Sequence, residues 1–217
     1  MTIFDDTACL LCTLNRIYMS ELFKQHLQKF IAIDEEKFHD VLSFFELKRV
    51  KKKENILVEG QVCKFNYFVL HGCMRMFFIN EKGVEHTTQF AIENWWITDN
   101  MAYEHQLQTE FYIQAVEDTR LLTIHAESQE KLLSRYPEME RYFRYIYQRA
   151  CAASQRRIKY IYDFSREELY NHFQLVNPQF VQRIPQYLIA SYLGFTPEYL
   201  SEIRRKKTNL NQFKFFV

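Results

Sequence analysis

The cysteines and histidines, the residue types that most often bind metal ions or carry nucleophilic chemistry, are scattered along this sequence. Its seven histidines show none of the HxH, HxxxH or HExxH spacings that bring two imidazoles to one metal ion. Of the five cysteines, only Cys9 and Cys12 lie close enough together to form half of a metal-binding or redox motif. The sequence therefore predicts no catalytic residues, no metal site, no cofactor and no enzyme activity.

The segment from Gln186 to Arg205 has the residue types of a helix-turn-helix. Such a motif needs a small residue where its helices cross, a turn residue that tolerates positive φ, and apolar residues that hold the second helix. Ala190 and Gly194 meet the first two needs, and Thr196 and Pro197 suit the start of the second helix. The apolar residues are Ile189, Leu193, Phe195, Leu200 and Ile203. This pattern favours a DNA-binding motif over an ordinary helical hairpin.

The second helix of this motif is expected to enter the major groove of DNA. Its N-terminal residues would then reach base edges, and its basic end would lie close to phosphates. The candidate DNA-binding residues are Thr196, Glu198, Tyr199, Ser201, Glu202, Arg204, Arg205 and Lys206.

Short apolar and aromatic runs fill residues 47 to 124, the stretch that must position any binding site ahead of the motif. Gly and Asn residues interrupt these runs at roughly ten-residue intervals, a spacing typical of an antiparallel sandwich or barrel. Before them, apolar residues at three-to-four spacing predict two short helices between Ser20 and Glu46, with Asp34 as the N-cap of the second.

Pro137 opens the longest helical segment, which contains no further Pro or Gly until Pro178. A narrow stripe spaced by four and three residues predicts a dimer interface, and it stops at Arg157. The stripe consists of Met139, Phe143, Ile146, Ala150 and Ala153. The alternative is a long helix packed on its own domain. A further helix is expected from Ser165 to about Val176.

Charge is unevenly distributed, although the net charge is only +1. Seven acids and no Lys or Arg lie between Gly83 and Thr119, whereas six basic residues face two acids from Arg183 onward. A basic end on a neutral or acidic body is typical of a nucleic-acid-binding domain carried by a sensor. The sequence has no 18-residue apolar segment and no basic region of a secretory signal, so a cytoplasmic protein without a membrane partner is expected.

Together these features resemble the cyclic AMP receptor protein and fumarate-nitrate regulator (CRP/FNR) family. The segments KKKENILVEG, FNYFVLHGCMRMFF and AVEDTRLLTI are similar to its β-roll strands, and RIPQYLIASYLGFTPEYLSEIRRK is similar to its DNA-binding motif. The resemblance implies an α+β fold. Its parts would be a jelly-roll sensor domain with flanking helices (residues 1–136), a long dimerisation helix (137–164) and a C-terminal winged helix-turn-helix domain (165–217).

The resemblance also implies a function. Family members are bacterial transcription regulators that bind palindromic operators as homodimers, so the expected partners are double-stranded DNA, a second copy, RNA polymerase and a small-molecule effector. Glu198 matches a family position whose carboxylate accepts a hydrogen bond from a cytosine amino group. Glu202 stands where many members have an Arg that contacts guanine. Either the operator differs from the family consensus, or Arg205 takes this role.

The expected ligand pocket departs from the family pattern. Cyclic-nucleotide-binding members carry a Gly-Glu pair for the ribose and an Arg for the phosphate, but here Ile97-Thr98 lie near the former and Thr109 and Glu110 replace the latter. A buried phosphate needs a paired cation, and a nearby acid adds repulsion. The degenerate pocket, with Trp96, Thr98, Thr109 and Glu110 as candidates, is therefore predicted not to bind cyclic nucleotides.

Two alternatives stay open beside a small-molecule-controlled regulator. One is a jelly-roll small-molecule-binding or metal-dependent (cupin-like) protein with a helical C-terminal interaction domain. The other is a regulator that is constitutive or controlled by a protein partner. Some family members ligate an iron–sulfur cluster with three N-terminal cysteines and a distant fourth, but only Cys9 and Cys12 occur here, so no cluster is expected.

Overall fold

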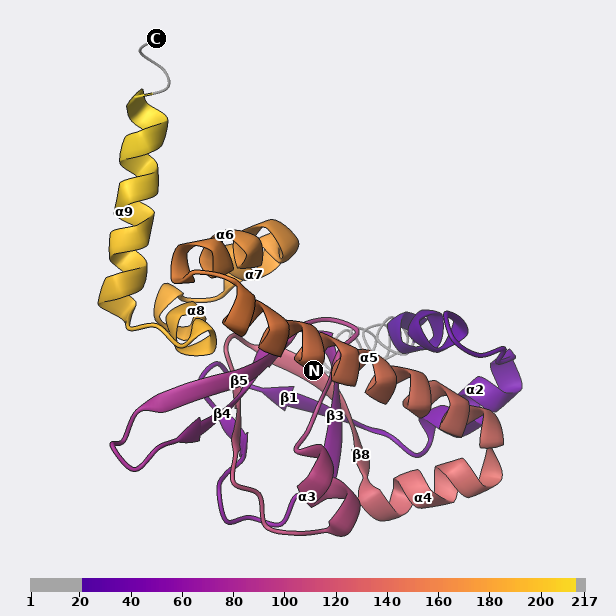
Figure 1. Cartoon of the computed structure of the whole chain (residues 1–217). Helices are drawn as coiled ribbons and strands as arrows, with labels where there is room; N and C mark the ends of the chain where they lie inside the picture. The colour runs from indigo at the N-terminus through magenta and orange to yellow at the C-terminus, as the bar shows by residue number, and fades with distance from the viewer. Residues whose placement is uncertain (1–20, 214–217) are drawn as a thin grey trace, which may run out of the picture. The chain divides into compact units, whose positions relative to one another are not determined.

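The structure is a computed structural model that describes the backbone of residues 21–213 and the side chains of residues 21–206. These residues form an α+β fold with two four-stranded sheets, as predicted (Figure 1). The first sheet has the strand order β1 (Glu46–Val50), β8 (Thr119–His125), β3 (Phe65–His71) and β6 (Trp96–Ile97). The second has the order β2 (Asn55–Leu57), β7 (Tyr112–Ala115), β4 (Met74–Ile79) and β5 (Glu85–Ala91).

Strand β3 shows why these sheets form a sandwich covered by helices. Its central residues are all buried, because alternate side chains enter two different cores. Tyr67 and Val69 lie in the apolar cluster that contains residues of both sheets, whereas Phe68 and Leu70 lie in a cluster rich in helical residues. The sequence run FNYFVLH therefore lacks the polar–apolar alternation of a strand with one face in water.

The described chain forms two compact units, and the boundary between them divides the long helix α5 (Pro137–Asp163). The first unit contains residues 21–76 and 90–149, and the second contains residues 77–89 and 150–213. The tip of the β4–β5 hairpin is thus grouped with the C-terminal helices. The domain boundaries expected from the sequence (1–136, 137–164 and 165–217) stay a prediction.

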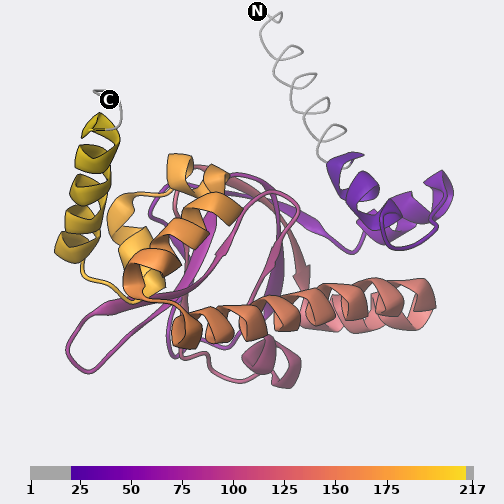
Figure 2. The ribbon, with the colours of Figure 1, turned by 45° about the horizontal axis from the view of Figure 1, so that its top comes forward.

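Helices fill the second core of the first unit. Residues 21–28 are helical, and they are followed by α2 (Glu35–Leu42), whose N-cap Asp34 accepts a hydrogen bond from the Lys37 amide as predicted. After β8 come α4 (Ala126–Arg135) and the start of α5 (Pro137–Asp163), with Tyr136 between them in the chain. Figure 2 shows α4 beside the start of α5. The short helix α3 (Asn100–His105) lies between β6 and β7 in the chain and packs Tyr103 into the sandwich core.

The second unit contains the hairpin tip and the C-terminal helices. These are the end of α5, α6 (Arg166–Val176), α7 (Pro178–Arg183), α8 (Gln186–Leu193) and α9 (Pro197–Phe213). Ser165 begins α6 with a capping box, because its hydroxyl accepts from the Glu168 amide while the Glu168 carboxylate accepts from the Ser165 amide.

The β wing implied by the family resemblance is absent from the described part of the chain. No strand flanks α8 and α9 within residues 150–213, and α9 continues to Phe213. The physical reason is that the sequence after Ile203 contains neither Gly nor Pro and has no alternation of apolar and polar residues, so nothing ends the helix or favours a strand. The described residues thus confirm the helix-turn-helix of the expected fold, and the wing stays a prediction.

Candidate DNA-binding motif and sensor pocket

Helices α8 and α9 form the predicted helix-turn-helix. Gly194 adopts φ +76° at the end of α8, a left-handed conformation that glycine adopts readily. Thr196 begins α9, and its hydroxyl accepts from the Tyr199 amide at 3.2 Å. Ala190 is fully buried, as are Leu200 and Ile203 on the inner side of α9. The motif therefore has the crossing residue, turn, cap and interhelical core that its sequence predicts.

The outer side of α9 carries the polar candidates. Glu198, Ser201, Glu202 and Arg205 are exposed, and their spacing of three to four residues places them on one helical face. Arg204 and Lys206 flank this face at its C-terminal end and are also exposed. Figure 1 shows α9 extending past the other helices of its unit. The face is thus presented to solvent.

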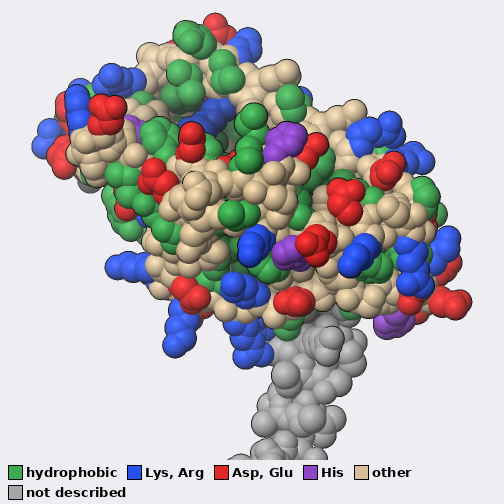
Figure 3. All heavy atoms as spheres, turned by 90° about the horizontal axis from the view of Figure 1, so that it is seen from below, with side chains coloured by type: hydrophobic (Ala, Val, Ile, Leu, Met, Phe, Trp, Pro, Cys, Tyr) green, Lys and Arg blue, Asp and Glu red, His purple; other side chains and the backbone are tan. Residues whose placement is uncertain are grey.

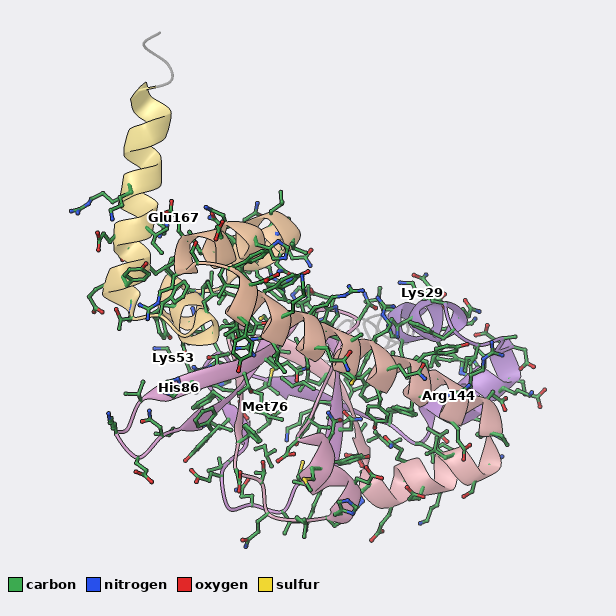
Figure 4. The ribbon with its side chains drawn as sticks, in the orientation of Figure 1. Lys29, Lys53, Met76, His86, Arg144 and Glu167 are labelled. Carbon is green, nitrogen blue, oxygen red and sulfur yellow. The ribbon has the colours of Figure 1, made fainter. Side chains whose placement is uncertain are left out.

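Two of these acidic and basic candidates bind each other. The Lys206 ammonium lies 2.9 Å from the Glu202 carboxylate, one turn earlier on α9. The hydrogen bond from Lys206 lowers the pKa of Glu202 and raises the pKa of Lys206. Glu167, which is labelled on α6 in Figure 4, adds a second negative charge that raises the pKa of Lys206. Glu202 therefore offsets the charge of a basic side chain within the motif.

Tyr199 differs from its neighbours because it is half-buried. Its ring packs edge-on against Phe195 at 5.6 Å, and the Arg166 guanidinium lies 5.3 Å from the ring centroid. Arg166 belongs to the first turn of α6, so Tyr199 connects α6 to the start of α9. This geometry gives Tyr199 a packing role within the motif.

The predicted dimer stripe on α5 divides into a buried and an exposed part. Met139 and Phe143 are buried in the protomer's own helical core, and Ile146 packs against that core. These three side chains are thus occupied within one protomer. Ala150 and Ala153 are exposed, and so are four further residues of the same helix end: Cys151, Ser154, Ile158 and Ile161.

The Thr109 side chain, at the expected ligand pocket, is buried and hydrogen-bonded within the protein. Thr109 is 2% exposed and donates to the Asp99 carboxylate at 2.8 Å, while the Phe111 amide donates to the Thr109 hydroxyl. Asp99 also caps α3 by accepting from the Ala102 amide at 3.2 Å. Glu110 is exposed beside Thr109. The group next to Thr109 is thus a carboxylate, which repels a phosphate.

The Thr98 side chain lies beside Cys63 of the sandwich core, whereas Trp96 lies in the other core. The Thr98 hydroxyl donates to the Phe65 carbonyl at 2.9 Å and lies 3.3 Å from the Cys63 thiol, whose pKa is raised by burial. Trp96 instead packs in the helical cluster, where its indole donates to the Tyr142 hydroxyl at 2.8 Å. The structure thus separates Trp96 from the other three pocket candidates.

Arg75 is buried, with 3% of its surface exposed, but its positive charge does not lie in the sandwich interior. Its guanidinium donates twice to the Gln114 amide oxygen, at 2.7 and 3.0 Å. Met74, Ile113 and Ala115 lie in the sandwich core, and side chains alternate along a strand, so Arg75 and Gln114 face the opposite side.

Sequence reasoning missed three features of this region. It did not assign a role to Asp99, although an acid before the NMAY segment is a recognisable N-cap. It also missed Ser191 and Arg157, which bind main-chain groups of the hairpin. No local pattern identifies these two, because their partners lie 104 and 69 residues away.

Within residues 21–206, no three His, Cys, Asp or Glu side chains lie close enough together to hold a metal ion. Cys9 and Cys12 lie outside the described residues. No helix in the described part of the chain combines the length and hydrophobicity needed to cross a bilayer. The surface in Figure 3 shows Lys and Arg interspersed with Asp and Glu.

Comparison with known proteins agrees with this architecture. Residues 47–136 match the cyclic nucleotide-binding domain family. No protein of curated function is significantly similar to the chain in sequence.

Three solved structures are similar to this fold. FixK2 from Bradyrhizobium japonicum has a TM-score of 0.66 at 16% identity, covering 77% of this chain and 86% of its own. The regulator CLP from Xanthomonas campestris, which responds to c-di-GMP, has a TM-score of 0.65 at 12% identity, with coverage of 82% and 93%. A regulator from Eubacterium rectale assigned to the CRP/FNR family has a TM-score of 0.62 at 17% identity, with coverage of 80% and 83%.

These findings define a cyclic nucleotide-binding-type domain followed by a helix-turn-helix. The chain has the fold of CRP/FNR-type transcription regulators.

Proposed function

We propose that this chain is a DNA-binding transcription regulator that acts as a homodimer on a palindromic operator and is not controlled by a cyclic nucleotide. The observation that carries the proposal is the exposed polar face of α9, held by the capped turn at Gly194 and Thr196. A helix presented in this way fits the major groove, and two copies related by a two-fold axis read half-sites about 34 Å apart.

The position of each candidate residue on α9 indicates whether it contacts a base or a phosphate. Glu198, at the start of α9, accepts a hydrogen bond from a cytosine amino group, and Arg205, on the same face, donates to a guanine. Arg204 and Lys206 flank this face and contact phosphates. Glu202 reduces the net positive charge because it pairs with Lys206.

Selection from a randomised DNA library tests the operator model. The wild-type protein is expected to select a palindrome, and Glu198→Ala to lose the preference at one base pair of each half-site, worth about 1–3 kcal/mol. Arg205→Ala is expected to do the same at a different base pair. Glu46→Ala, at an exposed acid of β1, is the control that leaves both preferences intact. If the wild-type protein selects no palindrome, the proposed function is wrong.

The homodimer is supported by the exposed end of α5. Cys151, Ser154, Ile158 and Ile161 are spaced three, four and three residues apart, and Ile158 and Ile161 are more than half exposed. Apolar residues at this spacing form the seam between paired helices. The interface proposed here thus lies toward the C-terminal end of the stripe predicted from the sequence, with Ala150 and Ala153 beside it.

Cysteine cross-linking tests this interface. In a Cys9→Ser, Cys12→Ser background, Cys151 is the one exposed cysteine among the described residues, because Cys63 and Cys73 are buried. A short bismaleimide is expected to produce a covalent dimer, and further replacement of Cys151 by Ser to abolish it. A protein that sediments as a monomer at micromolar concentration would contradict the homodimer.

The absence of cyclic-nucleotide control follows from the charges at the expected pocket. Thr109 binds Asp99, and Glu110 adds a second carboxylate nearby. A cyclic phosphate at this position would meet two negative charges and would have to displace an internal hydrogen bond.

A further inference from the structure

Strand β5 lies at the edge of its sheet, and part of that edge is bound by the helix-turn-helix. The Ser191 hydroxyl of α8 accepts from the Thr87 amide at 2.9 Å and donates to the Glu85 carbonyl at 2.8 Å. An edge strand normally offers such main-chain groups to solvent or to another strand. Here a single serine takes the place of a neighbouring strand, and Thr87 is only 2% exposed.

Arg157 reinforces the same contact from α5. Its guanidinium donates to the Thr88 carbonyl of the hairpin and, at 2.7 Å, to the Tyr192 carbonyl of α8. The guanidinium also stacks on the Tyr192 ring, 4.0 Å from its centroid. The Tyr192 carbonyl is one of the last four of α8, which lack partners within the helix.

The chemistry of arginine suits this position. A planar guanidinium can donate to two carbonyls and stack on a ring at the same time, which a lysine ammonium cannot do. Arg157, which interrupts the apolar stripe of α5 in the sequence, is therefore explained by its binding to the hairpin and α8. The contact made by Ser191 and Arg157 with residues 85–88 and Tyr192 is called the hairpin contact below.

We infer that Ser191 and Arg157 are positioning residues for DNA binding, which hold the helix-turn-helix on the β4–β5 hairpin. The inference rests on the proposed function. Ser191 and Tyr192 lie within one turn of Gly194, so the hairpin contact fixes the end of α8 from which α9 starts. Neither Ser191 nor Arg157 belongs to α9, and its polar face remains exposed while the contact is formed.

The hairpin contact therefore orients the motif without blocking it. A motif that is already held in one orientation loses less conformational freedom on binding, which increases affinity without any new contact to DNA. The two strands of the hairpin also continue into the sandwich, where Met74 of β4 and Ala91 of β5 lie in the buried core. The hairpin thus links the sensor domain to the helix-turn-helix through continuous main chain.

Hydrogen exchange and DNA binding of the full-length protein test this inference together. Ser191→Ala removes the hydroxyl, Ser191→Thr retains it, and Arg157→Lys keeps the charge but loses the planar fork. Ser134→Ala, at an exposed serine of α4, is the matched control. We expect the Thr87 amide to exchange at least about 10-fold faster in Ser191→Ala, because its hydrogen-bond acceptor is gone.

The operator selected by the wild-type protein then provides the second readout. Ser191→Ala and Arg157→Lys are each expected to raise the Kd by about 3- to 10-fold, the effect of losing one or two hydrogen bonds. Because no phosphate contact is lost, the dependence of Kd on salt concentration is expected to keep its wild-type slope. Ser191→Thr is expected to restore both the slow exchange and the wild-type Kd.

Three results would overturn the inference: slow Thr87 exchange in Ser191→Ala, an unchanged Kd despite fast exchange, or a salt slope that becomes shallower by about 1 when the charge itself is removed in Arg157→Gln. The last would mean that Arg157 contacts a phosphate directly. Failure of the proposed function is a separate result, because the wild-type protein would then select no operator at all.

Discussion

His26 is expected to make the stability of this protein depend on pH between 7 and 5. Its imidazole is 6% exposed in the helical core, where Nδ1 lies 2.9 Å from the Tyr142 hydroxyl. Burial is the main cause that lowers the pKa of His26 to about 4, and the positive charges of Lys29 and Arg149 act in the same direction. Lys29 is labelled in Figure 4. The native state thus favours the neutral imidazole.

The sign and size of the effect follow from the two pKa values. In the unfolded chain a histidine has a pKa of about 6.5, so below this pH the unfolded state binds a proton that the native state excludes. The contribution of His26 to stability is complete above pH 6.5 and is lost as the pH falls toward 4. At pH 5, about 1.5 units below the unfolded pKa, the loss relative to pH 7 is about 2 kcal/mol.

Urea unfolding followed by tryptophan fluorescence measures this loss at one fixed protein concentration. Between pH 7 and pH 5, the free energy of unfolding of the wild-type protein is expected to fall about 2 kcal/mol further than that of His26→Gln. Glutamine does not titrate and can still accept from Tyr142. His39→Gln, at an exposed histidine of α2, is expected to behave like the wild type. An equal fall in wild type and His26→Gln would refute the reasoning.

Two further predictions concern the domain formed by the two sheets. Gly72→Ala is expected to lower the Tm by about 4–8 °C, because its φ of +104° costs roughly 1–2 kcal/mol with a side chain and the added Cβ would lie 2.8 Å from the Asp118 carbonyl oxygen. Gly60→Ala, whose φ is +83° with no atom within 4 Å, is the control that bears only the first cost in thermal unfolding. Calorimetry is expected to show no binding of cyclic AMP at micromolar concentration, and a micromolar Kd would disprove the charge argument made for Thr109 and Glu110.

Local signals allowed much of the fold to be predicted. Asp34, Ser165 and Thr196 all begin helices where the sequence places a capping residue, since N-cap preferences depend on a few neighbouring residues. Gly194 ends α8 for a similarly local reason. The residues after Ile203 include neither Gly nor Pro, so the continuation of α9 to Phe213 also follows from local sequence.

Residue types could not decide which surface an apolar side chain covers. Met139 and Ala153 belong to one periodic stripe, but the first is fully buried in its own protomer and the second is exposed. A helix that packs on its own core and one that pairs with a partner show the same spacing. Trp96 is a similar case, because successive side chains of a short strand enter different cores and its sequence position alone does not identify which one.

A family resemblance predicts where a site lies in the chain, but it does not predict which hydrogen bonds this chain's own side chains form there. The resemblance locates the stretch near Thr98 and Thr109, but the Asp99–Thr109 hydrogen bond comes from this chain's own side chains and favours a neutral or positive group over a phosphate. The hairpin contact likewise depends on a serine and an arginine that bind main chain, so it places few demands on the sequence of β5. The Ser191 hydroxyl binds main-chain groups of Glu85 and Thr87 and also lies 3.2 Å from the Thr87 hydroxyl, so its hydrogen bonds to β5 involve the side chain of Thr87 and otherwise main chain. Such an arrangement lets the ligand chemistry of the β-roll diverge while the hold on the helix-turn-helix is kept.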